Sequence, residues 1–193
     1  MKTTIYFVRH AQPLHSWTGA DSLRPLTDEG LADTNVVTQF LNDRRIDEYH
    51  SSPAVRCIET IRPAAEIASQ KIVLHPLLIE RTSGPNGNTL PLFEQRWNDH
   101  TFHEPGGESI KAVQTRAVPE LERLILQTQG KTLVLGTHGT LFACLRNYYD
   151  PTFSYPNFQR LMDWMPFITE MTFEGTSQIG ITEHLHLYKK YTG

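Results

Sequence analysis

The chain has 193 residues, a mass of 22.1 kDa and a formal net charge of −3, with 39% hydrophobic and 20% charged residues. These values predict one well-buried domain over residues 1–193, and the lack of a basic run argues against a nucleic-acid-binding protein. No apolar stretch approaches about 18 residues, and the first apolar run has four, so we expect no membrane span, no signal peptide and a cytoplasmic location.

The N-terminal part of the chain alternates between strand-like and helix-like patterns. Residues 3–8 are apolar and β-branched, which is typical of a buried strand. Apolar side chains recur at helical spacing over residues 28–41, and Thr27 directly before them is a typical N-cap. A short strand is expected at 46–50. This order indicates a chain that passes between a sheet and the helices covering it.

The middle of the chain is predicted to contain a helix, a short strand and a long loop. Ser52 is the expected N-cap of the helix and Pro53 its first residue, a position that tolerates the missing amide of proline. A third strand is expected at 72–74. Residues 82–106 hold glycine, proline, asparagine and aromatic residues without periodicity. Because loops of this length are uncommon unless functional, we predict that 82–106 covers an active site.

The remaining patterns complete an α/β chain. Glu174-Gly175-Thr176-Ser177 is typical of a turn that joins two strands. Alternating strands and helices followed by a hairpin predict a three-layer α/β/α sandwich with a mainly parallel sheet and an antiparallel edge. The elements expected in this part are helices at 110–125 and 140–148 and strands at 132–136, 167–173 and 178–188.

Polar side chains suited to phosphate chemistry follow each of the first four predicted strands. In a parallel sheet, ligands bind beyond the carboxyl ends of the strands, so these side chains are expected to meet at one rim. They are Arg9 and His10 after the first strand, Ser51-Ser52-Pro53 with Arg56 after the second, Glu80 after the third and His138 after the fourth.

The residue types at this rim predict phosphoryl transfer. Neutral His10 can attack phosphorus as a covalent nucleophile. Arg9 and Arg56 offer planar donor forks that match phosphate oxygens, and His138 adds a donor when a nearby phosphate favours its protonated form. Glu80 is the candidate proton donor to the leaving oxygen and the candidate base for the water that follows. Glu108 is a rival for that role.

Six segments of the chain carry a family resemblance. They are Arg9-His10, Leu26-Thr27-Asp28-Glu29-Gly30, the segment from Ser51-Ser52-Pro53 to Thr60, Leu78-Ile79-Glu80, Gly106-Gly107-Glu108-Ser109 and Thr137-His138-Gly139. In this order they resemble the histidine phosphatase superfamily, also called phosphoglycerate mutase-like. The resemblance implies that fold, with His10 as the phosphoacceptor and Glu80 as the proton donor. It also implies a phosphate pocket of Arg9, Arg56 and His138.

Two departures from the family pattern leave the substrate open. Ala11-Gln12-Pro13 follows the first histidine where the family often has Gly-Glu-Thr. Pro85-Asn86-Gly87-Asn88 stands where it usually has an element such as Trp-Glu-Gly. Ser16, just past the nucleophile loop, and Arg81 are candidate substrate-binding residues. Sugar phosphates, phosphoglycerates, nucleotides and phosphoamino acids all remain open, as does the oligomeric state.

The sequence therefore predicts a metal-independent phosphomonoester hydrolase that acts through a phosphohistidine intermediate on a small phosphorylated molecule. The first alternative is a phosphoglycerate mutase-type isomerase, which requires extra cationic groups in its cover. Residues 82–106 contain Arg96 as their only lysine or arginine, which favours the hydrolase. The second alternative is a non-catalytic phosphate-binding regulator, for which Glu80 would be unnecessary.

No metal or cofactor is expected. The chain has nine histidines, but the pairs His184/His186 and His100/His103 lack a third ligand at a recognisable spacing, so surface or packing roles are expected. Cys57 and Cys144 lie on apolar stretches outside any C-x-x-C unit. Buried free thiols are therefore expected rather than a disulfide.

Overall fold

A computed structural model describes residues 1–85 and 87–191, so Asn86 of the predicted cover lies outside the described residues. One sheet has the strand order β3-β2-β4-β1-β5-β6. The first four strands of that order run parallel, while β5 pairs antiparallel with β1, and β6 pairs antiparallel with β5. The predicted mainly parallel sheet with an antiparallel edge is confirmed. The strands are β1 (Lys2–Arg9), β2 (Glu48–Ser51), β3 (Ile72–Leu74), β4 (Thr132–Thr137), β5 (Trp164–Glu174) and β6 (Ser177–Tyr188).

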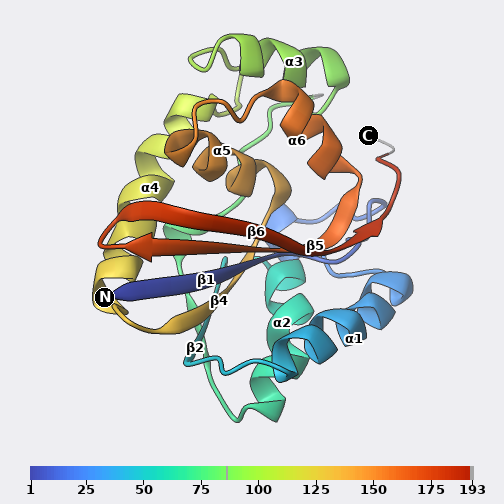
Figure 1. Cartoon of the computed structure of the whole chain (residues 1–193). Coiled ribbons are helices and arrows are strands. Elements are labelled where there is room, and N and C mark those ends of the chain that lie inside the picture. Colours follow the sequence, from blue (N-terminus) through green and yellow to red (C-terminus); the bar gives the residue numbers. More distant parts are fainter. Residues whose placement is uncertain (86, 192–193) are drawn as a thin grey trace.

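Helices cover both faces of this sheet, as Figure 1 shows. Side chains of β1 alternate between the faces: Ile5 and Phe7 join one buried cluster, and Tyr6 and Val8 join the other. This period of two follows from the pleat of a strand. The second cluster belongs to α1 (Asp28–Asn42) and α2 (Val55–Ile67). The first belongs to α3 (Leu90–Asn98), α4 (Ile110–Gln127), α5 (Gly139–Tyr149) and α6 (Tyr155–Met162). The two short 3-10 helices are η1 (Asp21–Leu23) and η2 (Pro76–Leu78).

The starts of two helices, α1 and α2, test the expectations from sequence. Thr27 is the N-cap of α1, and its hydroxyl accepts a hydrogen bond from the amide of Gly30 at 3.0 Å, as predicted. The prediction for α2 was wrong: this helix begins at Val55, after an N-cap at Ala54. The Ser52 hydroxyl lies 2.7 Å from Nε2 of His138 and accepts a hydrogen bond from the amide of Ala54 at 3.3 Å, two residues before the helix proper. The α3 helix in the cover and the short α6 were not predicted.

The cover at 82–106 is built around the buried carboxylate of Glu104. Arg81 donates to Glu104 Oε1 at 2.9 Å, and Arg96 donates to Oε2 at 2.7 Å. The amide of Gly84 donates to Oε1 at 3.0 Å. A Cβ at position 107 would lie 2.3 Å from Oε1, so the chain needs glycine there. Burial alone would raise the pKa of Glu104, but these hydrogen bonds outweigh it and lower the pKa to about 2.

Replacing Glu104 with glutamine is expected to lower the free energy of unfolding by about 3 kcal/mol, because two buried guanidinium groups lose their counter-charge. The pKa of about 2 in the folded protein lies below the ordinary value of 4.5. The stabilisation is therefore complete above about pH 4.5 and is lost as pH falls toward 2. Urea unfolding of the parent and of Glu104→Gln at pH 7 and pH 3 measures this difference in the free energy of unfolding. The matched control is Glu94→Gln, at an exposed position of the same helix as Arg96, and an equal loss of stability in both variants would contradict the assignment.

A chain of buried polar contacts ties the sheet to α4 near the functional rim. Nε2 of His50 lies 3.0 Å from Glu48, and Nδ1 of the same ring lies 2.9 Å from Nε2 of His75. Nδ1 of His75 lies 2.7 Å from Glu120 on α4. His50 stands two residues before Ser52, and His75 directly precedes η2, which leads to Glu80. The network thus fixes the backbone from which two rim segments extend.

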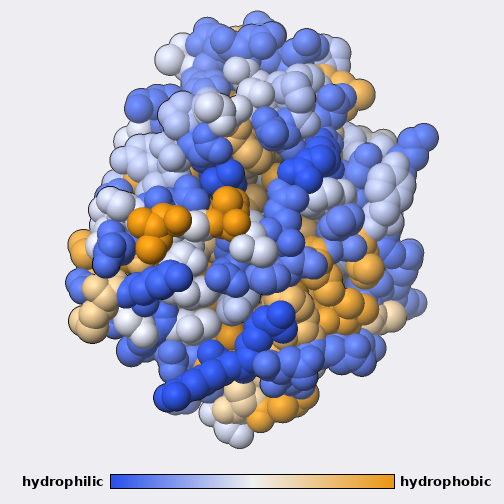
Figure 2. Space-filling model, viewed as in Figure 1, coloured by the Kyte–Doolittle hydropathy of each residue, from blue (hydrophilic) through white to orange (hydrophobic). Residues whose placement is uncertain are grey.

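The β6 strand forms one outer edge of the sheet. Ile179 and Ile181 of β6 are exposed, and Figure 2 shows apolar patches over this strand with hydrophilic atoms around them. Cys57 and Cys144 are buried and not bonded to each other, as expected. Over residues 1–85 and 87–191, none of the helices combines the length and the apolar character needed to cross a bilayer.

Candidate active site

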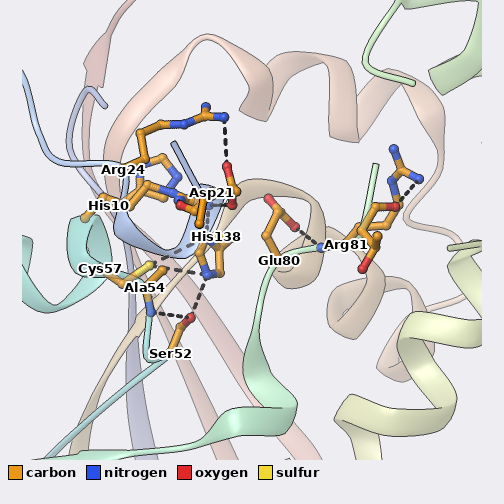
Figure 3. A network of polar contacts seen from close by, with 12 residues as sticks. His10, Asp21, Arg24, Ser52, Ala54, Cys57, Glu80, Arg81 and His138 are labelled. Atoms are coloured by element: carbon orange, nitrogen blue, oxygen red, sulfur yellow. Dashed lines mark hydrogen bonds and ion pairs between the residues drawn. The ribbon is translucent and has the colours of Figure 1, made fainter. Parts of the chain in front are cut away.

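A cavity of about 510 Å³ opens where the carboxyl ends of the parallel strands meet the cover. It brings together side chains from four loops that are far apart in sequence. Those singled out from sequence as catalytic all line it: Arg9, His10, Arg56, Glu80 and His138. Figure 3 shows His10 and His138 close together, with Glu80 beside them on a separate segment of the chain. The expectation that these five residues share one rim is met.

His10 is held in one orientation and one protonation form. Its Nδ1 lies 2.8 Å from the carbonyl oxygen of Ala11, so Nδ1 carries the hydrogen and donates it. Nε2 then bears the lone pair. Burial, reinforced by the positive charge of Arg56, lowers the pKa of His10 well below its ordinary value. A neutral imidazole with a lone pair on Nε2 is the form that can act as a nucleophile.

This geometry predicts that His10 stays neutral at a pH where an ordinary histidine is half protonated. We expect its ring nitrogen resonances, assigned by their loss in His10→Ala, to show the Nδ1–H tautomer and no titration between pH 8 and pH 6.5. A histidine in an unstructured peptide, with a pKa near ~6.5, serves as the reference. Nitrogen-15 NMR makes the measurement, and a midpoint at or above the reference would contradict the burial argument.

Arg9 is anchored on one side and open on the other. Its Nη1 donates to three carbonyl oxygens where α6 ends and β5 begins: Leu161 at 2.6 Å, Met162 at 3.2 Å and Trp164 at 2.7 Å. Its buried Nε has no hydrogen-bond partner within the described part of the chain. A Cβ at Gly139 would lie 2.9 Å from the guanidinium carbon, so the glycine after His138 makes room for Arg9. Burial lowers the pKa of Arg9 to about 10, which leaves it charged at neutral pH.

Arg56 and His138 form a connected pair across the cavity floor. Nη2 of Arg56 donates to Nδ1 of His138 at 3.3 Å, so that nitrogen is an acceptor and Nε2 carries the hydrogen that reaches Ser52. The rings of His10 and His138 meet edge to face with centroids 5.5 Å apart. Burial first, and then the charge of Arg56, lowers the pKa of His138. The free site therefore holds both imidazoles in their neutral form.

Asp21, which the sequence did not single out, lies beside Arg56. Arg56 donates to the Asp21 carbonyl at 2.7 Å and to its Oδ2 at 2.9 Å. Oδ1 of Asp21 pairs with Arg24 at 2.8 Å (Figure 3). The carboxylate therefore sits between two guanidinium groups at the cavity wall. The nearby Leu26-Thr27 helix start marks this loop in the sequence, but no pattern there shows which side chain turns inward.

Glu80 is oriented by backbone amides at the start of α5. Oε1 accepts from Arg81 and Leu141, both at 2.8 Å, and Oε2 accepts from Thr140 at 3.1 Å. Because helix N-termini present free amides, they hold a carboxylate well. Arg116 binds the carbonyl oxygen of Glu80 at 3.0 Å and so fixes the backbone beneath it.

The rival carboxylate, Glu108, is turned away from the cavity lining. It accepts from Arg116 Nε at 2.8 Å and from the amide of Thr82 at 2.8 Å. Burial would raise the pKa of Glu108, but these hydrogen bonds outweigh it and leave the pKa below its ordinary value. Glu108 thus supports Arg116, which sequence reasoning missed, whereas Glu80 faces the cavity.

The two candidate substrate-binding residues lie in different places. Ser16 is exposed and does not line the cavity, although its neighbour His15 does. Arg81 forms part of the wall, but its guanidinium points away from the two histidines toward Glu104 (Figure 3). A role for either side chain in substrate binding stays a prediction.

The remaining histidines make local contacts. His184 lies 2.8 Å from Glu170, and the ring of His186 stacks on Trp164 with centroids 3.9 Å apart. Nδ1 of His103 is 3.2 Å from the carbonyl oxygen of Glu104. Within residues 1–85 and 87–191, no three His, Cys, Asp or Glu side chains are grouped to hold a metal ion.

Comparison with known proteins agrees with this fold. The model of the histidine phosphatase superfamily (branch 1) matches residues 5–174, and the chain belongs to this family. No curated protein sequence matches the chain.

Solved structures share the phosphoglycerate mutase-like α/β fold at low sequence identity. A mycobacterial glucosyl-3-phosphoglycerate phosphatase aligns over 95% of this chain and 97% of its own, with a TM-score of 0.73 and 18% identity. A phosphoserine phosphatase mutant from Entamoeba histolytica aligns over 95% and 96%, with a TM-score of 0.72 and 18% identity. The phosphoglycerate mutase of Bacillus anthracis aligns over 92% and 91%, with a TM-score of 0.72 and 17% identity. The likeness thus includes both phosphatases and a mutase.

Proposed function

We propose that this chain is a metal-independent phosphomonoester hydrolase acting through a phosphohistidine intermediate on a small phosphorylated molecule. The observation that carries the proposal is the state of His10. Its Nδ1 hydrogen is fixed on Ala11, and burial lowers its pKa. The ring lies in one cavity with Arg9, Arg56 and Glu80. Family membership and the phosphatases among the structural relatives support the same reaction.

The reaction has two displacements at phosphorus. First, the lone pair on Nε2 of His10 forms a P–N bond while the ester P–O bond breaks, and a proton from Glu80 goes to the leaving oxygen. The alcohol then departs. Next, a water gives its proton to the Glu80 carboxylate while its oxygen forms a P–O bond and the P–N bond breaks. Inorganic phosphate leaves, His10 regains its lone pair, and Glu80 is protonated again.

Fixed positive charge stabilises both transition states. Arg9 lines the cavity and has its Nη1 occupied by carbonyl oxygens, so its remaining N–H donors would bind an equatorial phosphoryl oxygen. Arg56 supplies the second fork. His138 is neutral in the free site, and a bound dianion favours its protonation at Nδ1; Nη2 of Arg56, which donates to Nδ1 in the free site, then donates to the phosphoryl group instead. These groups are held in place before the substrate arrives, which is what electrostatic catalysis requires.

The cover favours hydrolysis over the mutase reaction. A mutase must hold a second phosphoryl group and therefore needs cationic groups facing the cavity from its cover. Arg96 is the only lysine or arginine in residues 82–106, and its guanidinium is paired with Glu104 and the carbonyl of Gly87. The positive charge of Arg96 is therefore neutralised within the cover, and Arg96 does not line the cavity.

Phosphate release tests the proposal against both alternatives. With a chelator present, we expect the protein to release inorganic phosphate from simple esters and to form an acid-labile, alkali-stable phosphoprotein after rapid quenching with phosphorus-labelled substrate. Interconversion of phosphoglycerates that depends on bisphosphoglycerate, with little phosphate release, would indicate a mutase. Phosphate binding without turnover of any ester would indicate a regulator. Either result would overturn the proposal.

A further inference from the structure

A small side cavity branches from the main cavity beside Glu80. It measures about 50 Å³, the space of roughly four water-sized groups. Five residues line both cavities and so mark the junction: the polar Arg9, Glu80 and Thr140, and the aromatic Phe93 and Tyr191. The apolar part of the side-cavity wall comes from α3, α6 and the segment that follows β6: Phe93, Phe158, Leu161, Met162 and Tyr191. The side cavity thus begins at the groups that would handle the leaving oxygen.

The inner wall of this side cavity is apolar. Phe93, Phe158 and Met162 are buried and carry no strong hydrogen-bonding group. Tyr191 brings a hydroxyl, but it already donates to the carbonyl oxygen of Asn88 at 2.7 Å. A hydroxyl or carboxylate placed against these walls would lose its hydration without compensation, whereas an apolar group would gain from burial.

Tyr191 closes the side cavity because the residues after β6 turn back over α6. The amide of Tyr191 donates to Asp163 Oδ1 at 2.7 Å, and the amide of Lys189 donates to the carbonyl of Asp163. The ring of Tyr191 lies edge to face on the ring of Phe93, with centroids 6.0 Å apart. The backbone amide, the ring and the hydroxyl of Tyr191 each have a partner, so this part of the cavity wall is fixed by specific contacts.

We propose that the side cavity binds the carbon skeleton of the leaving alcohol, and that the preferred substrates are phosphate monoesters of apolar alcohols with a short aliphatic branch or an aromatic edge. This inference rests on the proposed hydrolase function. The leaving oxygen must reach Glu80, which stands at the junction, so the carbon bonded to that oxygen lies at the mouth of the side cavity. A polyol or sugar meets polar side chains only at the mouth, at Arg9, Glu80 and Thr140, and the α6 side chains beyond them offer its hydroxyls no partner.

Two matched esters test the inference. In 2-methylbutyl phosphate, methyl groups stand where glycerol 3-phosphate has hydroxyls, and both are primary alkyl esters. We expect kcat/KM to be about 10- to 100-fold higher for 2-methylbutyl phosphate. Equal or higher kcat/KM for the glycerol ester, still requiring His10, would overturn the inference and leave the hydrolase proposal standing. Failure of both esters and of aryl phosphates would overturn both.

Substitutions in the wall locate the preference. Met162→Gln places an amide in the side cavity with little change of volume, and we expect the ratio of the two kcat/KM values to fall at least about fivefold. The matched control is Met165→Gln, since Met165 is also a buried methionine but lines the main cavity alone. Its ratio is expected to stay near the parent value. Thermal unfolding verifies that both variants fold, and an equal change of the ratio in both would overturn the assignment to the side cavity.

Discussion

Replacing His10 with alanine is expected to lower kcat for phosphate esters by at least about 10,000-fold, because no other group can form the covalent intermediate. The labelled phosphoprotein seen after quenching should disappear as well. The protein should still fold, since the ring makes one local hydrogen bond, to Ala11. Steady-state phosphate release, mass spectrometry of the quenched protein and thermal unfolding make the three measurements.

A histidine outside the cavity provides the control for His10→Ala. His184 lies on β6, where it contacts Glu170, and does not line the cavity. His184→Ala is expected to retain the parent kcat. Turnover by His10→Ala within about tenfold of the parent would remove His10 from its proposed role.

Replacing Glu80 with glutamine is expected to give a loss of activity that depends on the leaving group. An alkoxide needs a proton as it departs, so kcat for an alkyl phosphate should fall about 100- to 10,000-fold. A nitrophenolate departs without one, so the first step for para-nitrophenyl phosphate should slow less than about tenfold. Burst kinetics separate this step from hydrolysis of the phosphoprotein, in which Glu80 also acts as the base.

Glu108→Gln is the comparison for Glu80→Gln. Glu108 contacts Arg116, which in turn holds the backbone of Glu80, so this variant can change the position of Glu80 without removing its carboxylate. Because its effect acts through the position of Glu80, we expect it to slow the alkyl ester more than the nitrophenyl ester, and the alkyl ester by less than Glu80→Gln does. A leaving-group dependence in Glu108→Gln, but not in Glu80→Gln, would exchange the two assignments.

Much of the fold follows from local signals in the sequence. The alternation of apolar runs with helical patterns predicted six strands and four of the six α-helices, because each buries one face in a regular period. The α3 and α6 helices have nine and eight residues, too short for that period to stand out, and proline follows the first residue of each. Their formation depends on packing of Phe93 and Phe158 against the core, a tertiary effect that local pattern does not contain.

The rim could be predicted because the topology of a parallel sheet converts sequence position into spatial position. Arg9, His10, Arg56, Glu80 and His138 each stand at or soon after a strand end or helix start, so their convergence was expected. Long-range side-chain pairings were not predictable. Arg81 pairs with Glu104, Ser52 hydrogen-bonds to His138, and Asp21 pairs with Arg56. The partners in each pair are far apart in sequence and meet only in the folded chain. The side cavity was hidden for the same reason, since its wall includes α6 and Tyr191.

The position of Asp21 means that an incoming phosphoryl group meets a resident counterion. When a phosphoryl group binds, Arg56 must release or share the Asp21 carboxylate. The free energy gained at Arg56 is therefore the difference between its interaction with phosphate and its interaction with Asp21, which is smaller than the gain at an unpaired guanidinium. When inorganic phosphate departs, the same carboxylate can return to Arg56, which lowers the cost of release. Asp21 belongs to η1, just ahead of α1, so under the proposed reaction we expect each turnover to involve a small rearrangement of that loop.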